Sequence, residues 1–494
     1  MAISFNAATL LNGNGIDVNT LVSQIQSQES GQLTIWQQQQ SDLQTQASAL
    51  SNLNTDLSNL ATAVNTLTDP LGALTAMTAT SSMPGILTAT AQSSAATANH
   101  VIVVSSLASA GTVYTDAVAG GADASILPSG AAAGDLKLQI GGSHGATENI
   151  PITAGSNDTL SSLVSYINQQ SATNTWGVTA AVLNDASGAR LAIYSQASGT
   201  PGALAITGNT TTDGNGNDTG NPTLLTFEKP VGGSDASLTI DGIPFSSTSN
   251  TVTGAIPGVT LNLISAEPDV PLQLTVGADT TQASTAINAF VVAYNALTAA
   301  INQQFTVDPT SNTEGPLGSD SSLRSLQSSL FADVNYSISG NSGFVNLASL
   351  GVNMNNDGTL TVDNTTLNNA LSSNPSAVLN FFQNATQSFG NHFSSDLTNL
   401  TDPVNGLLNL DLAQNSTEQS DLSTQISNFQ DQLATQKQQL INQYSEVNAT
   451  LEEYPYLLAE VTAQLGNILP TSSNTSPTQG TIATSSTTSG TSGS

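Results

Sequence analysis

Large apolar side chains recur at heptad spacing near both ends of the chain. In the N-terminal arm they alternate in steps of three and four, as at the a and d positions of a coiled-coil seam, and only Gln46 interrupts the d series. The C-terminal arm repeats the pattern with one stutter near Lys437. We predict helix pairing and self-association through Leu43, Leu50, Leu53, Leu57, Leu60, Val64 and Leu67 in the first arm, and through Leu422, Ile426, Phe429, Leu433, Leu440, Tyr444, Val447, Leu451, Leu458, Val461 and Leu465 in the second.

Neither apolar stripe is stable in water alone. Each large apolar side chain left exposed forgoes about 1.5–3 kcal/mol of burial free energy. Each arm therefore requires a partner helix, either from the other arm of the chain or from another molecule. The alternative interpretation, two ordinary core helices of one globular domain, fits less well with long arms at opposite ends of the sequence.

The N-terminal arm has recognisable start and stop signals. Asp17 or Asn19 is suited to cap a first helix with Leu21, Val22 and Ile25 on one face. The heptad arm itself is expected from about residue 33 to residue 67, where Asp69, Pro70 and Gly72 end it. In the C-terminal arm Pro455 falls inside the heptad run, so a kink or a fresh helix start is expected there.

The region between the arms is expected to contain short strands, turns and a few helices. The dipeptide Asp241-Gly242 predicts a β-hairpin turn, an amphipathic helix is predicted at 158–170, and helical spacing returns from Ala283 onward. Strands are predicted at 86–90, 101–105, 237–240, 259–263 and 272–276. From the N-terminal arm, the chain is therefore expected to pass first through β-rich segments and then through helices to the C-terminal arm.

Composition and charge exclude several classes of partner. The chain has 494 residues and a formal net charge of -30, with only five basic residues. These are Lys137, Arg190, Lys229, Arg324 and Lys437. Binding to nucleic acid requires clustered Lys and Arg, so a nucleic-acid partner is excluded. The same acidity opposes docking on an anionic membrane, and no apolar run is expected to approach the ~20 residues that span a bilayer.

Candidate chemistry is sparse. There is no cysteine, so disulfides and thiolate metal sites are excluded, and the only histidines are His100, His144 and His392, each isolated in the sequence. The N-terminus lacks the positively charged region of a secretory signal peptide. Residues 471–494 are almost entirely Ser, Thr, Gly and Asn and are expected to form a disordered tail. No catalytic residue, cofactor or metal ion is expected.

Several motifs follow one another in a recognisable order. They are DASLTIDGI at 235–243, AIPGVTL at 255–261, FVVAYNAL at 290–297, LGV at 350–352 and DGTL at 357–360. This ordered set resembles the bacterial flagellar filament cap family, also called hook-associated protein 2, over nearly the whole chain. The segment 158–199 is similar to a repeat shared by several axial flagellar proteins.

The resemblance implies an α+β multidomain fold in which the N- and C-terminal helices pair in a coiled-coil stalk and helical domain, with β-rich head domains inserted between them. The expected domains are a terminal helical stalk (1–40 with 436–470), a helical leg domain (41–75 with 281–435), a β-rich head domain (76–112 with 234–280), a second α+β head domain (113–233) and the tail (471–494).

The resemblance also implies a structural function at the distal tip of the flagellum. The protein is then expected to form a ring-like oligomer, a pentamer, and to promote folding and polymerisation of exported flagellin. Its other expected partners are hook-filament junction proteins, the flagellar export apparatus and a dedicated export chaperone. It is expected outside the cell, exported without a cleavable signal peptide, and without membrane insertion.

Other functions are less well supported by the residues. A tip adhesin would use a polar β-rich head, and another axial protein, such as a hook-filament junction component or a flagellin, would share the repeat at 158–199. An enzyme is disfavoured because Ser143 and His144 lack the spacing of a nucleophile elbow. The segment from Asp213 begins like a calcium loop, but Asp218 and Leu224 occupy the positions that require Gly and Glu.

Overall fold

The structure, a computed structural model, describes residues 11–12, 15–16, 18–129, 131–212, 224–228, 230–309 and 313–466. Several segments considered above lie outside this range, namely Asp17, the calcium-like segment 213–218, Lys229 and the tail at 471–494. The chain divides into two units, one formed by Met1–Ser51 with Leu410–Ser494 and the other by Asn52–Asn409. Each unit is described by itself.

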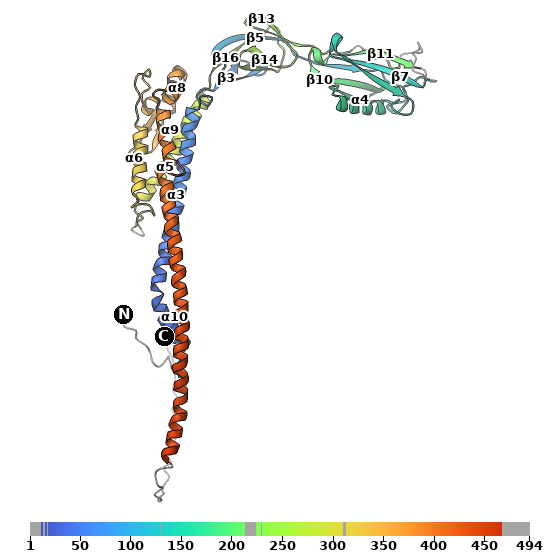
Figure 1. Cartoon of the computed structure of the whole chain (residues 1–494). Coiled ribbons are helices and arrows are strands. Elements are labelled where there is room, and N and C mark those ends of the chain that lie inside the picture. Colours follow the sequence, from blue (N-terminus) through green and yellow to red (C-terminus); the bar gives the residue numbers. More distant parts are fainter. Residues whose placement is uncertain are drawn as a thin grey trace, which may run out of the picture. The chain divides into compact units, whose positions relative to one another are not determined.

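The first unit is a helical stalk. It contains α2 (Val18–Glu29), the first part of α3 (Gly31–Thr68) and most of α10 (Leu407–Gly466), together with the short pair β1 (Leu11–Asn12) and β2 (Gly15–Ile16). Within this unit the N-terminal helices lie beside α10 (Figure 1). The side chain of Gln26 donates to the carbonyl of Leu433, and that of Asn415 donates to the carbonyl of Leu43. Residue numbers fall along α10 as they rise along α2 and α3, so the helices are antiparallel.

In the second unit, a helical domain surrounds the end of α3. Five phenylalanines form its aromatic core, in which Phe290 makes edge-to-face contacts with Phe389 and Phe393, and Phe381 stacks on Phe389 with ring centroids 5.2 Å apart. The fifth, Phe382, contacts Phe381 and Phe389 edge to face. The elements are α5 (Thr280–Phe305), α6 (Ser321–Val334), η3 (Leu347–Leu350), β17 (Val352–Met354), β18 (Leu360–Val362), α7 (Asn364–Ser373), α8 (Pro375–Gln383) and α9 (Phe389–Leu400).

Helix α5 corrects one expectation from the sequence. It is long and apolar enough, by length and composition alone, to cross a membrane. However, 44% of its most apolar stretch is buried inside the protein. Ile287, Phe290 and Tyr294 are fully buried at helical spacing, as in the core helix of a folded domain.

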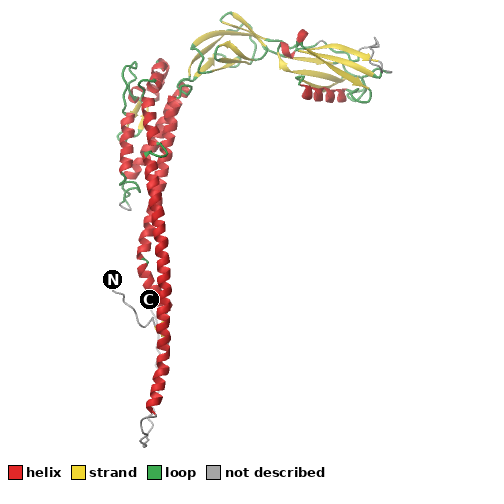
Figure 2. Cartoon of the chain, in the orientation of Figure 1, coloured by secondary structure: helices red, strands yellow, loops and turns green. Residues whose placement is uncertain are grey.

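Two sheets share one apolar core in the first β-rich region (yellow strands in Figure 2). The five-stranded sheet has the order β13-β12-β5-β16-β3, and the three-stranded sheet has the order β14-β15-β4. The bounds are β3 (Met77–Ser81), β4 (Leu87–Ala91), β5 (Ala98–Ser106), β12 (Ala236–Ile240), β13 (Ile243–Ser247), β14 (Thr251–Ile256), β15 (Val259–Leu263) and β16 (Leu272–Ala278). The predicted strands at 101–105, 237–240, 259–263 and 272–276 fall within these elements, and the prediction at 86–90 overlaps β4, which begins one residue later at Leu87.

The predicted hairpin turn is confirmed. Ile240 pairs with Ile243 across the two-residue turn, and Asp241 and Gly242 have φ values of 52° and 81°. A turn with two left-handed residues matches the twist of the strands it joins, which explains the preference for Asp-Gly.

The second β-rich region combines two three-stranded sheets with one helix. The sheet orders are β6-β10-β9 and β11-β7-β8. Helix α4 begins after Thr159, which forms a capping box with Ser162, so the predicted helix at 158–170 is present. The bounds are β6 (Ala110–Tyr114), β7 (Ala133–Ile140), η1 (Gly142–His144), β8 (Ala146–Thr153), α4 (Leu160–Asn174), β9 (Val178–Asp185), β10 (Gly188–Ser198), η2 (Thr200–Gly202) and β11 (Leu204–Thr212).

Candidate self-association surface

The predicted seam of the N-terminal arm is mostly buried. All of its positions lie on α3, in the stalk up to Ser51 and in the second unit after it. Leu43 is half-buried, and the buried positions are Leu50, Leu53, Leu57, Leu60, Val64 and Leu67. Thr68 is the last residue of α3, followed by the predicted stop signals Asp69 and Pro70.

The first half of the C-terminal seam is also covered. Leu422, Ile426 and Leu433 are buried in the stalk, and Phe429 is half-buried. The ring of Phe429 meets that of Trp36 edge to face, with centroids 5.3 Å apart. This geometry is favourable because the positive edge of one ring faces the negative face of the other.

Trp36 was missed by the sequence reasoning, although a signal for it exists. It precedes Leu43 by one heptad and therefore continues the same stripe toward the N-terminus. Asn415 was missed as well. It is 6% exposed and precedes Leu422 by one heptad, so it occupies a seam position that the apolar pattern could not reveal.

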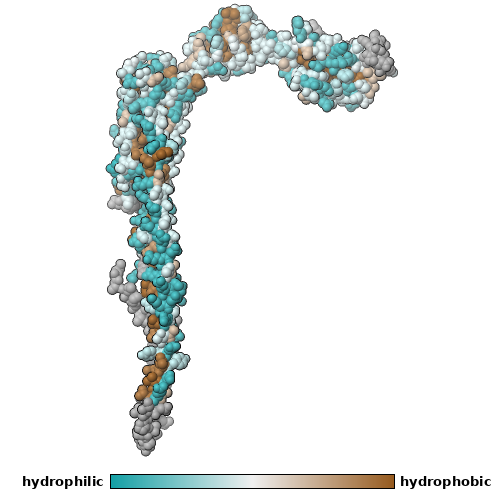
Figure 3. Space-filling model, in the orientation of Figure 1, coloured by the Kyte–Doolittle hydropathy of each residue, from teal (hydrophilic) through white to brown (hydrophobic). Residues whose placement is uncertain are grey.

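The second half of the C-terminal seam changes from covered to exposed. Leu440 and Tyr444 are half-buried, whereas every later predicted seam residue is between 44% and 63% exposed. These residues are Val447, Leu451, Leu458, Val461 and Leu465, and we call them the exposed stripe. Tyr454, Tyr456 and Leu457 add further exposed apolar surface, and brown apolar patches are visible at this end of α10 (Figure 3).

The register of the stalk explains where the exposed stripe begins. Gln26 lies opposite Leu433. Because the two helices are antiparallel, each residue before Gln26 in α2 is level with one residue further along α10. The start of α2 at Val18 is therefore level with about residue 441 of α10. Beyond that level, no described helix of this chain runs beside α10. Burying each large apolar side chain of the stripe would contribute about 1.5–3 kcal/mol. The stripe therefore favours contact with a further helix.

Pro455 does not end the helix. Of the two expected outcomes, a fresh helix start is wrong, because α10 continues from Leu407 to Gly466 with Pro455 inside it. The proline leaves the carbonyl of Leu451 without its usual amide donor. The exposed stripe therefore lies on one unbroken helix.

The polar face beside the stripe is acidic. Glu452, Glu453 and Glu460 lie on this part of α10, and no Lys or Arg follows Lys437 in the sequence. These exposed acidic groups face water, while the apolar stripe provides the contact surface. The arrangement can bind another apolar helix.

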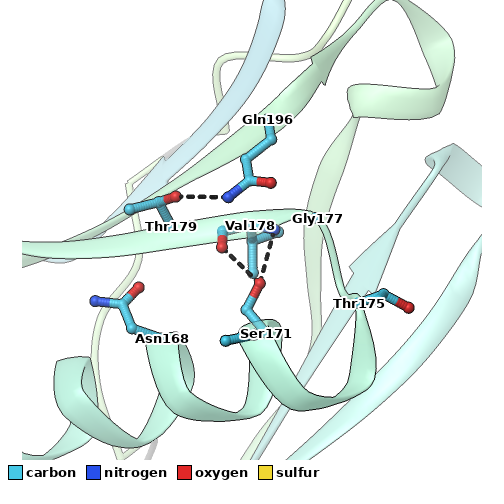
Figure 4. A pocket seen from close by; sticks show the side chains of 8 residues that line it. Asn168, Ser171, Thr175, Gly177, Val178, Thr179 and Gln196 are labelled. Carbon is cyan, nitrogen blue, oxygen red and sulfur yellow. Dashed lines mark hydrogen bonds between the residues drawn. The ribbon is translucent and has the colours of Figure 1, made fainter. Parts of the chain in front are cut away.

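A second candidate site is a polar cavity of about 450 Å³ at the C-terminal end of α4. Its polar side chains already bond the protein. Ser171 Oγ donates to the carbonyl of Val178 at 2.7 Å, and Gln196 Nε2 donates to Thr179 Oγ1 at 3.1 Å (Figure 4). Asn168 both donates to and accepts from the backbone of β9. Ser171 and Asn168 thus fasten α4 to β9, and Gln196 joins β10 to β9, so the polar side chains that line the cavity already serve the fold.

The serine and histidine considered as a catalytic pair are neighbours in an exposed turn. Ser143 and His144 belong to η1, and Ser143 Oγ lies 3.2 Å from His144 Nδ1. Adjacent residues of an exposed turn can meet in this way without any catalytic role. The turn interpretation accounts for both residues.

Comparison with known proteins places the chain in a family. Residues 233–455 match the family described as flagellar hook-associated protein 2 C-terminus, and residues 14–111 match the corresponding N-terminus family. The B-type flagellar hook-associated protein 2 of Pseudomonas aeruginosa is 32% identical over 330 residues, covering 63% of this chain and 67% of that protein.

Other relatives match over shorter parts or at the level of structure. The flagellar hook-associated protein 2 of Helicobacter pylori is 29% identical, but the match spans only 30% of this chain and 22% of that protein. The D1-D2-D3 domains of the flagellar cap protein FliD from Escherichia coli superpose with a TM-score of 0.56 at 26% identity, covering 74% of this chain and 99% of that one. The motifs, the folds of the domains and these matches agree, and the chain belongs to the flagellar hook-associated protein 2 family of flagellar cap proteins.

Proposed function

We propose that this protein caps the distal tip of the bacterial flagellum, where it promotes folding and polymerisation of exported flagellin and prevents its loss to the medium. The observation that carries the proposal is the exposed stripe on α10 in a chain of this family. A cap must attach to helices that belong to other molecules, and the stripe is a surface of that kind.

The proposed assembly is a ring-like homo-oligomer, a pentamer. In it the exposed stripe packs against α10 of a neighbouring subunit or against helices at the end of the filament. The covered half of the seam pairs the two arms of one chain instead. The proposed domains are those expected from the sequence, with the stalk at 1–40 and 436–470, the leg at 41–75 and 281–435, and the heads at 76–112 with 234–280 and at 113–233.

The chemistry proposed for the cap consists of reversible contacts. Only 8% of the residues are charged, and the surface polarity comes mainly from Ser, Thr, Asn and Gln. Such a surface binds an unfolded flagellin chain weakly, which permits release once the flagellin has folded. No covalent step and no cofactor take part.

The proposed location is extracellular. The chain would leave the cell through the flagellar export apparatus, with a dedicated chaperone and without a cleavable signal peptide. Hook-filament junction proteins would be the surface on which the cap first assembles, before flagellin is added beneath it.

Deletion of the gene in its source bacterium tests this function. We expect bare hooks and abundant soluble flagellin in the medium, with filaments restored by the wild-type gene. Normal filaments after a clean deletion would overturn the proposal. Labelling of the wild-type protein distinguishes a cap from other axial proteins, because a cap gives one spot at the filament tip, whereas a junction protein labels the base and a flagellin labels the whole length.

A further inference from the structure

The end of α6 and the middle of α9 bring three potential metal ligands together. Asp333 lies in the last turn of α6, and His392 and Asp396 lie one turn apart on the same face of α9. One ligand atom from each residue is within 4.8 Å of the other two. The three residues are up to 63 positions apart in the sequence, so no sequence motif with a short, fixed spacing predicts the cluster.

The separations between the ligand atoms suit coordination better than direct hydrogen bonding. His392 Nε2 lies 3.5 Å from Asp333 Oδ1 and 3.8 Å from Asp396 Oδ2. Both distances exceed the usual hydrogen-bond length of about 2.7–3.2 Å. A tetrahedral zinc ion with bonds of about 2.0–2.1 Å holds its ligand atoms roughly 3.3–3.4 Å apart. Small side-chain movements would therefore complete the geometry.

Asp333 is the buried member of the cluster, and one of its oxygens is free to coordinate. Its side chain is 2% exposed, and its Oδ2 atom has no hydrogen-bond partner among the described residues. A buried carboxyl oxygen without a hydrogen-bond partner is unfavourable. In the described part of the chain, no Lys or Arg forms an ion pair with Asp333 or Asp396.

The site is both oriented and accessible. The ring of Tyr336 stacks on His392 with centroids 4.0 Å apart and an interplanar angle of 21°, which fixes the plane of the imidazole. The side chains of His392 and Asp396 are 37% and 42% exposed, so an ion can enter from solvent. A proton-sharing pair of carboxylates is the competing explanation.

We propose that Asp333, His392 and Asp396 bind a divalent transition-metal ion, with zinc as the best fit. One imidazole nitrogen and two carboxylate oxygens are ordinary zinc ligands, and water would take the fourth position. Calcium and magnesium fit less well, because they prefer more ligands, all of them oxygen. The ion would tie the end of α6 to α9. This inference departs from our expectation of no metal and does not depend on the cap proposal.

Zinc titration of the full-length protein tests the site. After treatment with a chelator, calorimetric titration at 150 mM salt with excess Mg²⁺ should reveal one zinc ion per chain, and Co²⁺ should give a visible absorption band with the same stoichiometry. Zinc should also raise the Tm. His392→Gln and Asp396→Asn should each weaken zinc binding by at least about tenfold, and Asp333→Asn should abolish the Tm increase.

The chain supplies a matched control in a second His–Asp pair. His100 Nδ1 lies 2.7 Å from Asp241 Oδ2, at true hydrogen-bond distance. His100→Gln should leave the zinc affinity and the Tm increase unchanged. Equal zinc affinity in the wild type and His392→Gln, loss of the site in His100→Gln, or no stoichiometric binding at all would overturn the proposal. His392 is half-exposed, so its variant remains informative even if Asp333→Asn does not fold.

Discussion

Asn415 donates a hydrogen bond from its side-chain amide to the backbone carbonyl of Leu43 at 3.1 Å, inside a mostly apolar seam. Gln419 in turn donates to the side-chain oxygen of Asn415 at 2.5 Å. A buried polar group in a seam of paired helices fixes their register at some cost in stability, because other alignments leave it without a partner. Asn415 therefore sets which residues of the two arms face each other.

Two replacements of Asn415 should distinguish its effect on the stability of the protein from its effect on the register of the two arms. Asn415→Ala leaves Gln419 without its acceptor and should lower the free energy of unfolding by about 1–2 kcal/mol. Asn415→Leu should instead raise the Tm while allowing alternative registers. Thermal unfolding measures the first effect, and cross-linking between cysteines placed on the two arms measures the second.

Asn428→Ala is the control for these two variants. Asn428 is an exposed residue of the same helix, so its loss should change the free energy of unfolding by less than about 0.5 kcal/mol. An Asn415→Leu protein that keeps a single cross-linking pattern would contradict the register argument.

The contact between Trp36 and Phe429 should contribute measurably to stalk pairing. Their edge-to-face geometry predicts a coupling free energy of about 0.5–1.5 kcal/mol in a double-mutant cycle of Trp36→Ala and Phe429→Ala. Trp36→Phe keeps an aromatic ring and should retain part of the coupling. Additive effects of the two alanine substitutions would mean that the rings are neighbours without interaction.

Local signals in the sequence predicted much of the fold. The heptad spacing predicted the helical arms, and Asp241-Gly242 predicted a two-residue turn, because each is a short-range pattern with one physical solution. The beginning of α10 at Leu407 was not predicted, since Asn415 occupies a seam position and hides the repeat there.

Contacts between distant residues could not be predicted in the same way. His392 looked isolated in the sequence because Asp333, its neighbour in space, lies on another helix. The extent of the exposed stripe could not be predicted from the sequence either. It depends on where the N-terminal arm ends relative to α10, and the heptad pattern is the same on both sides of that level.

The hairpin residue Asp241 should make stability depend on pH. A hydrogen bond from His100, and a second one from the amide of Val101, lower the pKa of Asp241 below its usual value. Because the pKa is lower in the folded state, the stabilisation is fully present above the unfolded pKa of about 3.9 and is lost as the pH falls through the folded value.

Denaturant unfolding of the wild type and Asp241→Asn checks this dependence. The variant should be less stable at pH 7, and the difference should shrink as the pH falls below about 4. His100→Gln removes the largest cause of the shift and should reduce the pH-dependent part. A difference that stays constant between pH 7 and pH 2 would assign the effect to the altered turn rather than to charge.

The exposed stripe should determine self-association without affecting the fold of the chain. Leu458 and Leu465 are 63% and 53% exposed, so serine at these positions removes little that the single chain has buried. In an assembled stalk each loss of about 1.5–3 kcal/mol would weaken association roughly ten- to a hundredfold. Sedimentation should therefore show the Leu458→Ser/Leu465→Ser protein dissociating at much higher concentration than the wild type, with an unchanged Tm for the monomer.

The matched control is Ala449→Ser/Ala463→Ser. It carries the same number of new hydroxyls on exposed positions outside the heptad seam and should associate like the wild type. If both double variants associate equally well, the stripe is not the contact surface, and the attachment of the cap must be sought elsewhere on the protein.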